Sequence, residues 1–319
     1  MRAARARAPA RRHLLRAIGG VGLAGGLGVV AGCTLRPDRD HAGEHAPWLG
    51  PPREHGGVAW VFSSGGPRGF THVGFLKAAA ELGLVPDLIV GASAGALIGA
   101  LRAAAMPAAR IESLAMGLEL TDVVRLALNA SERFSGAGLA DFIREQVADA
   151  AGVTRIEALP IAFAAVAMHR PPQGGEPEVV AFNHGDVGVA VQASAALEGR
   201  LTPVRIRGRV YVDADAAMPM PVRVARTLGA RTAIAVDASA HEERAPPGAE
   251  RYRVSDLRKR QLVAADATHA DLVLHPDFGY WVSLSQSFRA RAIAAGYRET
   301  MAAADRLRRL HARAVARAS

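Results

Sequence analysis

A short turn between two glycines limits what this chain can fold into. Ser93 lies two residues after Gly91 and two before Gly95, so the turn reads G-x-S-x-G. An apolar run predicts a strand over 88–90, and the residues that follow predict a helix over 96–101. A strand, a sharp turn with serine and a helix form a nucleophile elbow, in which side chains on the two glycines would collide with neighbouring backbone. The segment therefore predicts a parallel α/β sheet with an exposed, nucleophilic Ser93 at one end.

A glycine-rich loop lies upstream of this elbow. It consists of Gly65, Gly66, Pro67, Arg68 and Gly69. An apolar run predicts a buried strand over 58–62 before the loop, and a helix is predicted over 70–82 after it. Unpaired amides at the start of a helix can stabilise a developing oxyanion, and glycines let the backbone approach a ligand closely. A nucleotide-binding loop is the alternative, but the segment has no Walker lysine and no G-x-G-x-x-G.

A serine hydroxyl becomes a strong nucleophile only when a base takes its proton. The segment 208–212 predicts a strand, and Asp213 follows it directly, with no histidine in this part of the chain. The carboxyl ends of parallel strands line one crevice of an α/β sheet. Asp213 is therefore expected close to Ser93, although 120 positions separate the two residues.

These three motifs together resemble the patatin-like phospholipases, in particular their compact bacterial members. That family carries a G-x-x-[RK]-G loop, a G-x-S-x-G elbow and an aspartate at a strand end, and the resemblance runs from about Gly57 to 271–274 and beyond. It implies a three-layer α/β/α sandwich with a mostly parallel sheet. It also implies a dyad in which Ser93 is the nucleophile and Asp213 its base, with the residues from Gly65 to Gly69 as the oxyanion hole. The implied reaction is acyl-ester hydrolysis of phospholipids or lysophospholipids through an acyl-enzyme, without a metal or other cofactor.

Two departures from the family pattern bear on activity. The family motif D-G-[GA] is replaced by Asp213-Ala214-Asp215, and Leu197-Glu198-Gly199 stands where relatives commonly have a proline. A second carboxylate facing the site would raise one pKa and weaken the base. A strand continuation would point both carboxylates the same way, whereas a turn would separate them. A non-enzymatic envelope lipoprotein with a degraded dyad is therefore an alternative.

A conventional Ser-His-Asp esterase is a second alternative. The histidines that would supply its base are His169, His184, His241, His269 and His275, with His241 and His275 the leading candidates. His72 is expected on the first turn of a helix rather than in catalysis. His41 and His45 have a metal-like spacing but lie in a polar stretch, so no zinc site is expected. No acidic cluster has calcium spacing either.

The first 32 residues predict a signal peptide. They contain six arginines and no acidic residue, and an apolar, glycine-rich run from 17 to 30 precedes Cys33, the only cysteine of the chain. This ending resembles a bacterial lipobox, and Arg11-Arg12 resembles a twin-arginine signal. Lipidation of Cys33 would anchor the protein in the cell envelope, and Thr34 after it resembles lipoproteins sent to the outer membrane. An arginine-rich start on a cytoplasmic enzyme is the alternative.

Removal of residues 1–32 leaves 287 residues, enough for one α/β domain, predicted over 56–319. Residues 33–55 are polar and contain prolines, which predicts a tether. The formal charge falls from +9 to about +3 without the six arginines, so nucleic-acid binding is not expected. A proline-containing loop over 240–249 is placed to cover the site, and one long helix is predicted from 287 onward.

Overall fold

The computed structural model describes residues 39–53, 57–126, 134–171 and 175–316. The predicted signal peptide, 1–32, and the predicted lipidation site, Cys33, lie outside these residues. The described part of the predicted tether pairs with the domain, since His41 forms a bridge with Ile206 and Trp48 one with His184. This part of the tether is therefore packed against the domain rather than free of it.

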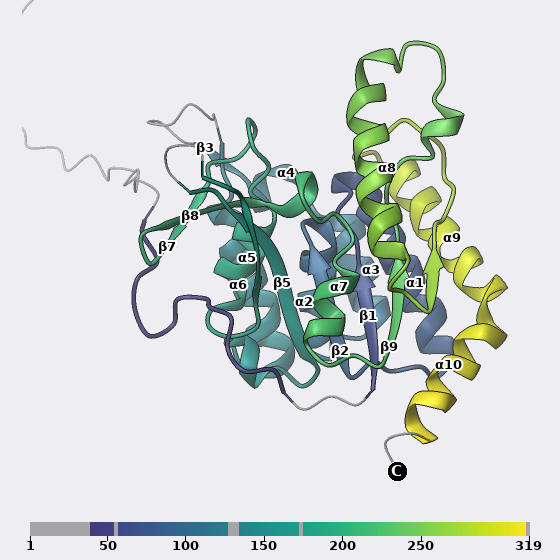
Figure 1. The fold of residues 1–319 in the computed structure, drawn as a ribbon, viewed down its shortest axis with the longest axis horizontal. Helices are drawn as coiled ribbons and strands as arrows, with labels where there is room; N and C mark the ends of the chain where they lie inside the picture. Colours follow the sequence, from purple (N-terminus) through teal and green to yellow (C-terminus); the bar gives the residue numbers. More distant parts are fainter. Residues whose placement is uncertain (1–38, 54–56, 127–133, 172–174, 317–319) are drawn as a thin grey trace, which may run out of the picture. The chain divides into compact units, whose positions relative to one another are not determined.

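An eight-stranded sheet forms the centre of the domain, with the path β10-β9-β1-β2-β5-β8-β7 and β6 on the side of β5 (Figure 1). The strands are β1 (Val58–Phe62), β2 (Leu88–Ala92), β5 (Ala162–His169), β6 (Glu178–Phe182), β7 (Val204–Ile206), β8 (Arg209–Asp213), β9 (Thr232–Val236) and β10 (Leu272–Leu274). The five strands from β10 to β5 are parallel. β6 and β8 run antiparallel to β5, and β7 runs antiparallel to β8. A separate antiparallel pair joins β3 (Arg125–Leu126) and β4 (Phe134–Ser135).

Helices connect most of these strands. They are α1 (Phe70–Glu81), α2 (Ala94–Ala103), α3 (Ala108–Gly117), α4 (Leu120–Val123), α5 (Ala137–Ala151), α6 (Val187–Ser194), α7 (Val222–Thr227), α8 (Arg253–Ala267), α9 (Gln286–Ala302) and α10 (Ala304–Ala316). The helices predicted over 70–82 and 96–101 are confirmed as α1 and α2. The prediction of one long C-terminal helix is wrong, because α9 ends at Ala302 and, after Ala303, a second helix, α10, begins.

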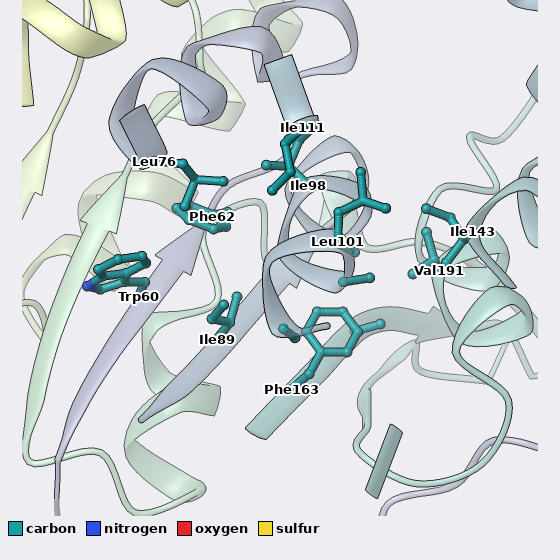
Figure 2. Close-up of a cluster of buried hydrophobic side chains, with 14 of the residues drawn as sticks. Trp60, Phe62, Leu76, Ile89, Ile98, Leu101, Ile111, Ile143, Phe163 and Val191 are labelled. Carbon is teal, nitrogen blue, oxygen red and sulfur yellow. The ribbon is translucent and has the colours of Figure 1, made fainter. Parts of the chain in front are cut away.

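Side chains of the central strands alternate between two helical layers. On β1, Trp60 and Phe62 point to one face of the sheet, where helices such as α1, α2 and α3 cover them (Figure 2). Ala59 and Val61 point to the other face, which α7 and α8 cover. The first face holds large side chains and the second mostly alanine and valine. Burial of both faces explains why the strands read as continuous apolar runs.

The observed order of layers is helix, sheet, helix, as the sequence predicts. The sheet is mixed at the β5 end, where the antiparallel strands join it. Within the described part of the chain, no helix combines the length and apolar character that crossing a bilayer requires.

Candidate active site

The elbow forms where β2 ends and α2 begins. Ser93 takes a φ of 54° and a ψ of −121°, a conformation that side chains rarely adopt and that stores strain. A Cβ on Gly95 would lie 2.2 Å from the carbonyl oxygen of Phe62, at the end of β1. A Cβ on Gly91 would lie 2.5 Å from the backbone of Gly95. The two glycines are therefore required by close backbone contact, and the strained turn projects the partly exposed Ser93 beyond the sheet.

The register of β5 explains how Asp213 reaches Ser93. β6 occupies one edge of β5, over the same β5 residues that pair with the end of β2 and with the end of β8. β2 and β8 therefore both lie on the other edge of β5. On that edge Ala92 of β2 lies opposite Val166, and Asp213 of β8 lies opposite Ala167. Because β2 is parallel and β8 antiparallel to β5, their carboxyl ends meet head to head. The expectation that Asp213 follows a parallel strand is wrong, but its expected neighbour is the observed one.

The Ser93 and Asp213 side chains are neighbours, and the Ser93 hydroxyl favours the ionised form of the Asp213 carboxyl. Asp213 is only 4% exposed, and burial is the main reason that its pKa rises from 3.8 to about 7. The negative charge of Asp215 adds to this rise. The neighbouring Ser93 hydroxyl and the hydrogen bond from the Asp215 amide, whose nitrogen lies 2.8 Å from Oδ1, oppose this rise. A carboxylate with a pKa near neutrality can accept a proton from a hydroxyl group and return it.

The second carboxylate of Asp213-Ala214-Asp215 does not share the position of the first. Residues 214–216 form a 3-10 turn rather than a strand continuation, and Ala214 needs no positive φ there. Asp215 accepts hydrogen bonds from the Ser64 hydroxyl and from the Lys259 ammonium, whose Nζ lies 2.6 Å from Oδ1. Burial opposes ionisation of Asp215, but these two partners outweigh it and hold the pKa of this carboxyl below its usual value. Lys259 therefore keeps Asp215 ionised while Asp213 faces Ser93.

The predicted oxyanion loop lies beside the elbow. Residues 66–69 form a 3-10 turn, and Gly66 takes a φ of 52°. A Cβ on Gly69 would lie 2.6 Å from the Cβ of Ala94, the residue after the nucleophile. Neither the Gly65 amide nor the Gly66 amide has a hydrogen-bond acceptor within the described residues. These free N–H groups, next to the start of α2, have the character of an oxyanion hole.

A comparison of the sequence with protein families gives a match over residues 60–226, more than half of the chain, to the family described as patatin-like phospholipase. The chain belongs to the patatin-like phospholipase family. The resemblance stated from the motifs is thereby confirmed, while the roles of Ser93, Asp213 and the loop stay predictions.

Curated relatives of this patatin-like chain extend beyond it. An uncharacterized NTE family protein of Mycobacterium bovis is 32% identical over 188 residues, which cover 58% of this chain and 50% of that protein. The human patatin-like phospholipase domain-containing protein 6 is 30% identical over 194 residues, or 58% of this chain and 14% of that protein. The chain thus spans half or less of the length of these relatives.

Among solved structures, VipD from Legionella pneumophila superposes with a TM-score of 0.52 at 16% identity. The match covers 79% of this chain and 67% of that chain. At this identity the likeness concerns the fold alone, and it agrees with the patatin-like α/β architecture.

Ser194, at the end of α6, is a site residue that sequence reasoning did not single out. Its buried hydroxyl accepts a hydrogen bond from the Ser93 amide at 2.9 Å and donates one to the Val166 carbonyl at 2.6 Å. Two residues later, the Ala196 carbonyl accepts the Asp213 amide at 3.0 Å. The end of α6 thus holds the backbones of both Ser93 and Asp213. The only signal in the sequence was the position of this segment within the family resemblance.

The Arg68 side chain points away from the dyad. Its guanidinium donates to the carbonyl oxygens of Gly279 and Tyr280 and lies 5.7 Å from the ring centroids of Phe278 and Tyr280. Burial lowers the pKa of this guanidinium. Arg68 therefore fastens the oxyanion loop to the segment that follows β10.

No histidine within the described residues contacts Ser93. His72 lies buried on the first turn of α1, as expected, and donates from Nε2 to the Ser63 carbonyl at 2.9 Å. Burial lowers the pKa of His72 to about 4, so its ring is uncharged at neutral pH. His241 and His275 stack on each other at 3.8 Å, and His275 lies 3.6 Å from Asp237 rather than near the nucleophile.

The remaining candidates for a triad base lie elsewhere. His169 contacts the Val210 carbonyl and His184 the Asn183 side chain, both at 2.9 Å. His269 precedes the amino end of β10, whereas Ser93 follows the carboxyl end of β2. Within the described residues, no group of three or more histidine, cysteine or acidic side chains is arranged to hold a metal ion. The predicted loop 240–249 contains a short 3-10 turn at Glu242–Arg244.

Proposed function

We propose that this chain is a serine lipid acyl hydrolase that cleaves ester-linked fatty acids from phospholipids or lysophospholipids. The observation that carries the proposal is that Ser93, held in a strained elbow, has the buried Asp213 carboxyl as a neighbour of its side chain. Membership of the patatin-like phospholipase family supports the lipid substrate class. The contacts of His241 and His275 with each other and with Asp237 make a Ser-His-Asp triad the weaker interpretation.

The cycle begins when Asp213 takes the proton of the Ser93 hydroxyl. The Ser93 oxygen then bonds to the ester carbonyl carbon, and the resulting oxyanion accepts hydrogen bonds from amides of the Gly65–Gly69 loop. The bond to the alcohol breaks, and protonated Asp213 gives its proton to the leaving oxygen. Water attacks the acyl-enzyme with Asp213 again as base, and the fatty acid leaves with Ser93 restored.

The first test is the substitution Ser93→Ala. Ester hydrolysis should fall to background, and a fluorophosphonate probe should label only the wild-type chain, while thermal stability changes little because one partly exposed oxygen is lost. Ser113→Ala is the matched control, since this exposed serine on α3 donates only to a carbonyl of its own helix. A wild-type chain that binds lipid but neither hydrolyses esters nor reacts with the probe would favour the non-enzymatic lipoprotein.

The cellular location is part of the same proposal. An arginine-rich start, a short apolar run and Cys33 at its end support export and lipidation, and several acyl chains would anchor the protein stably. The wild-type chain should then fractionate with outer membranes and require detergent for release. Cys33→Ala should leave the uncleaved precursor, whereas an unprocessed wild-type chain in the cytosol would refute the location.

A further inference from the structure

Exposed apolar side chains gather on one part of the described surface. Of the eleven large hydrophobic side chains that are exposed there, six lie between residues 252 and 284. These six, which we call the rim, are Tyr252, Val254, Leu257, Trp281, Val282 and Leu284. Val254 is 81% exposed and Trp281 48%. Single exposed apolar residues need no explanation, but a cluster that includes aromatic rings indicates a binding surface.

The two segments of the rim form one surface. The first comprises Tyr252 and the first turns of α8, and α8 rises beyond the sheet at the end where β1 points (Figure 1). The second follows β10. Trp281 packs edge to face against Tyr252, with ring centroids 6.2 Å apart, and against Tyr280 at 5.2 Å. The Tyr280 hydroxyl donates to Asp256 of α8, which fastens the second segment to the first.

Both segments are tied directly to the candidate active site. Arg68 of the oxyanion loop donates to the carbonyl oxygens of Gly279 and Tyr280, next to Trp281. Lys259 lies two residues after Leu257 and binds Asp215, the neighbour of the dyad base. The rim is therefore linked to the residues around Ser93 and Asp213 rather than placed on a distant face.

The charge around the rim is positive. Arg251, Arg253 and Arg258 are exposed, and none of the three has a carboxylate partner within the described residues. Most of the acidic side chains nearby are already paired, and the exposed Glu250 accepts a hydrogen bond from the Gly248 amide. Asp256 accepts the Tyr280 hydroxyl, Glu242 pairs with Arg260, Asp277 with Arg244, and Asp215 with Lys259. An apolar patch bordered by these three guanidinium groups, which have no carboxylate partner among the described residues, complements a surface with an apolar interior and anionic headgroups.

We propose that the rim is a docking surface for an anionic phospholipid bilayer. The aromatic and aliphatic side chains enter the boundary between headgroups and acyl chains, and the three arginines bind lipid phosphates. Docking in this orientation brings the carboxyl end of β2, where Ser93 projects, towards the bilayer and shortens the path of a lipid from the membrane to Ser93. The delivery of substrate rests on the proposed function, whereas the binding itself does not.

The test compares variants of the full chain carrying Cys33→Ser, so that no attached lipid contributes, and Ser93→Ala, so that vesicles stay intact. The parent and every variant share the same residues 1–32, so a difference in binding between them comes from the rim. Binding to vesicles of phosphatidylcholine with and without phosphatidylglycerol is measured by flotation. Combined Trp281→Ser and Val254→Ser should lower the partition coefficient at least about tenfold. Val85→Ser is the matched control, because this residue is 59% exposed in the connection between α1 and β2, outside the rim. It should bind like the parent chain.

A second variant tests the charges. Combined Arg251→Ser, Arg253→Ser and Arg258→Ser should lose at least about tenfold in binding to vesicles that contain phosphatidylglycerol, with little change on phosphatidylcholine alone. In chains that keep Ser93, both rim variants should hydrolyse a dissolved short-chain ester within about twofold of wild type.

Parent-like vesicle binding by both rim variants would overturn the proposal, as would a parallel loss of hydrolysis of the dissolved ester. A chain that dimerises through the rim without binding vesicles would assign the surface to protein contacts instead. If the wild-type chain binds vesicles through the rim but hydrolyses no ester, the docking surface stands and the proposed function fails.

Discussion

Replacing Asp213, the proposed base, should inactivate the protein and stabilise its fold at the same time. Asp213 is buried and its pKa rises from 3.8 to about 7, so between these values the folded chain holds a proton that the unfolded chain has released. The contribution of Asp213 to the free energy of unfolding therefore falls as pH rises through this window and is lowest above pH 7. Asp213→Asn keeps the shape of the side chain but removes the charge. Relative to wild type, the gain should be about 2 kcal/mol at pH 5 and at most about 4 kcal/mol at pH 8.

Urea denaturation of both chains at pH 5 and pH 8 measures this difference, and an ester assay should show at least about a hundredfold loss of activity. Asp149→Asn is the control. Its carboxylate is 63% exposed and pairs with Arg110 on the surface, so its removal should change stability little at either pH. An Asp213→Asn chain that is no more stable than wild type at pH 8, or whose advantage does not grow between the two pH values, would refute the argument that burial raises the pKa of the base.

Three further substitutions probe the support of the site. Asp215→Asn removes the charge that adds to the raised pKa of the base, so the midpoint of kcat/KM against pH should move to lower pH. A fall of one pH unit would give about fivefold more activity at pH 6 and little change at pH 8, and an unchanged or higher midpoint would contradict the coupling. Ser194→Ala leaves the Ser93 amide and the Val166 carbonyl without their hydrogen-bond partner, so the melting temperature should fall. We expect kcat to drop about tenfold or more, with KM less affected. Unchanged kinetics would show that Ser194 does not support the site. Gly95→Ala places a Cβ 2.2 Å from a carbonyl oxygen and should prevent a stable fold, whereas Gly117→Ala meets nothing within 4 Å and should be tolerated, as soluble yield and melting temperature would show. A well-folded Gly95→Ala chain would mean that the elbow can relax.

The local motifs were predictable because their geometry is set by adjacent residues. An apolar run, a glycine-flanked serine and a helix-forming run define the elbow within about a dozen positions, and the structure has β2 and α2 on either side of it. The break between α9 and α10 was not predictable in the same way, because Ala303 carries no glycine or proline signal. There the packing of Leu307 into the core decides the direction of the last helix.

The sequence by itself determined the family, the layer order and the type of each chemical group at the site. Only the tertiary structure decided how these groups meet. An alternation of apolar residues predicts a strand but not its direction, so the antiparallel course of β8, which brings Asp213 head to head with the end of β2, had no signal in the sequence. The contact of Lys259 with Asp215 likewise joins residues 44 positions apart. Strand register and helix placement follow from burying both faces of one sheet, which is a property of the whole domain and not of any single segment.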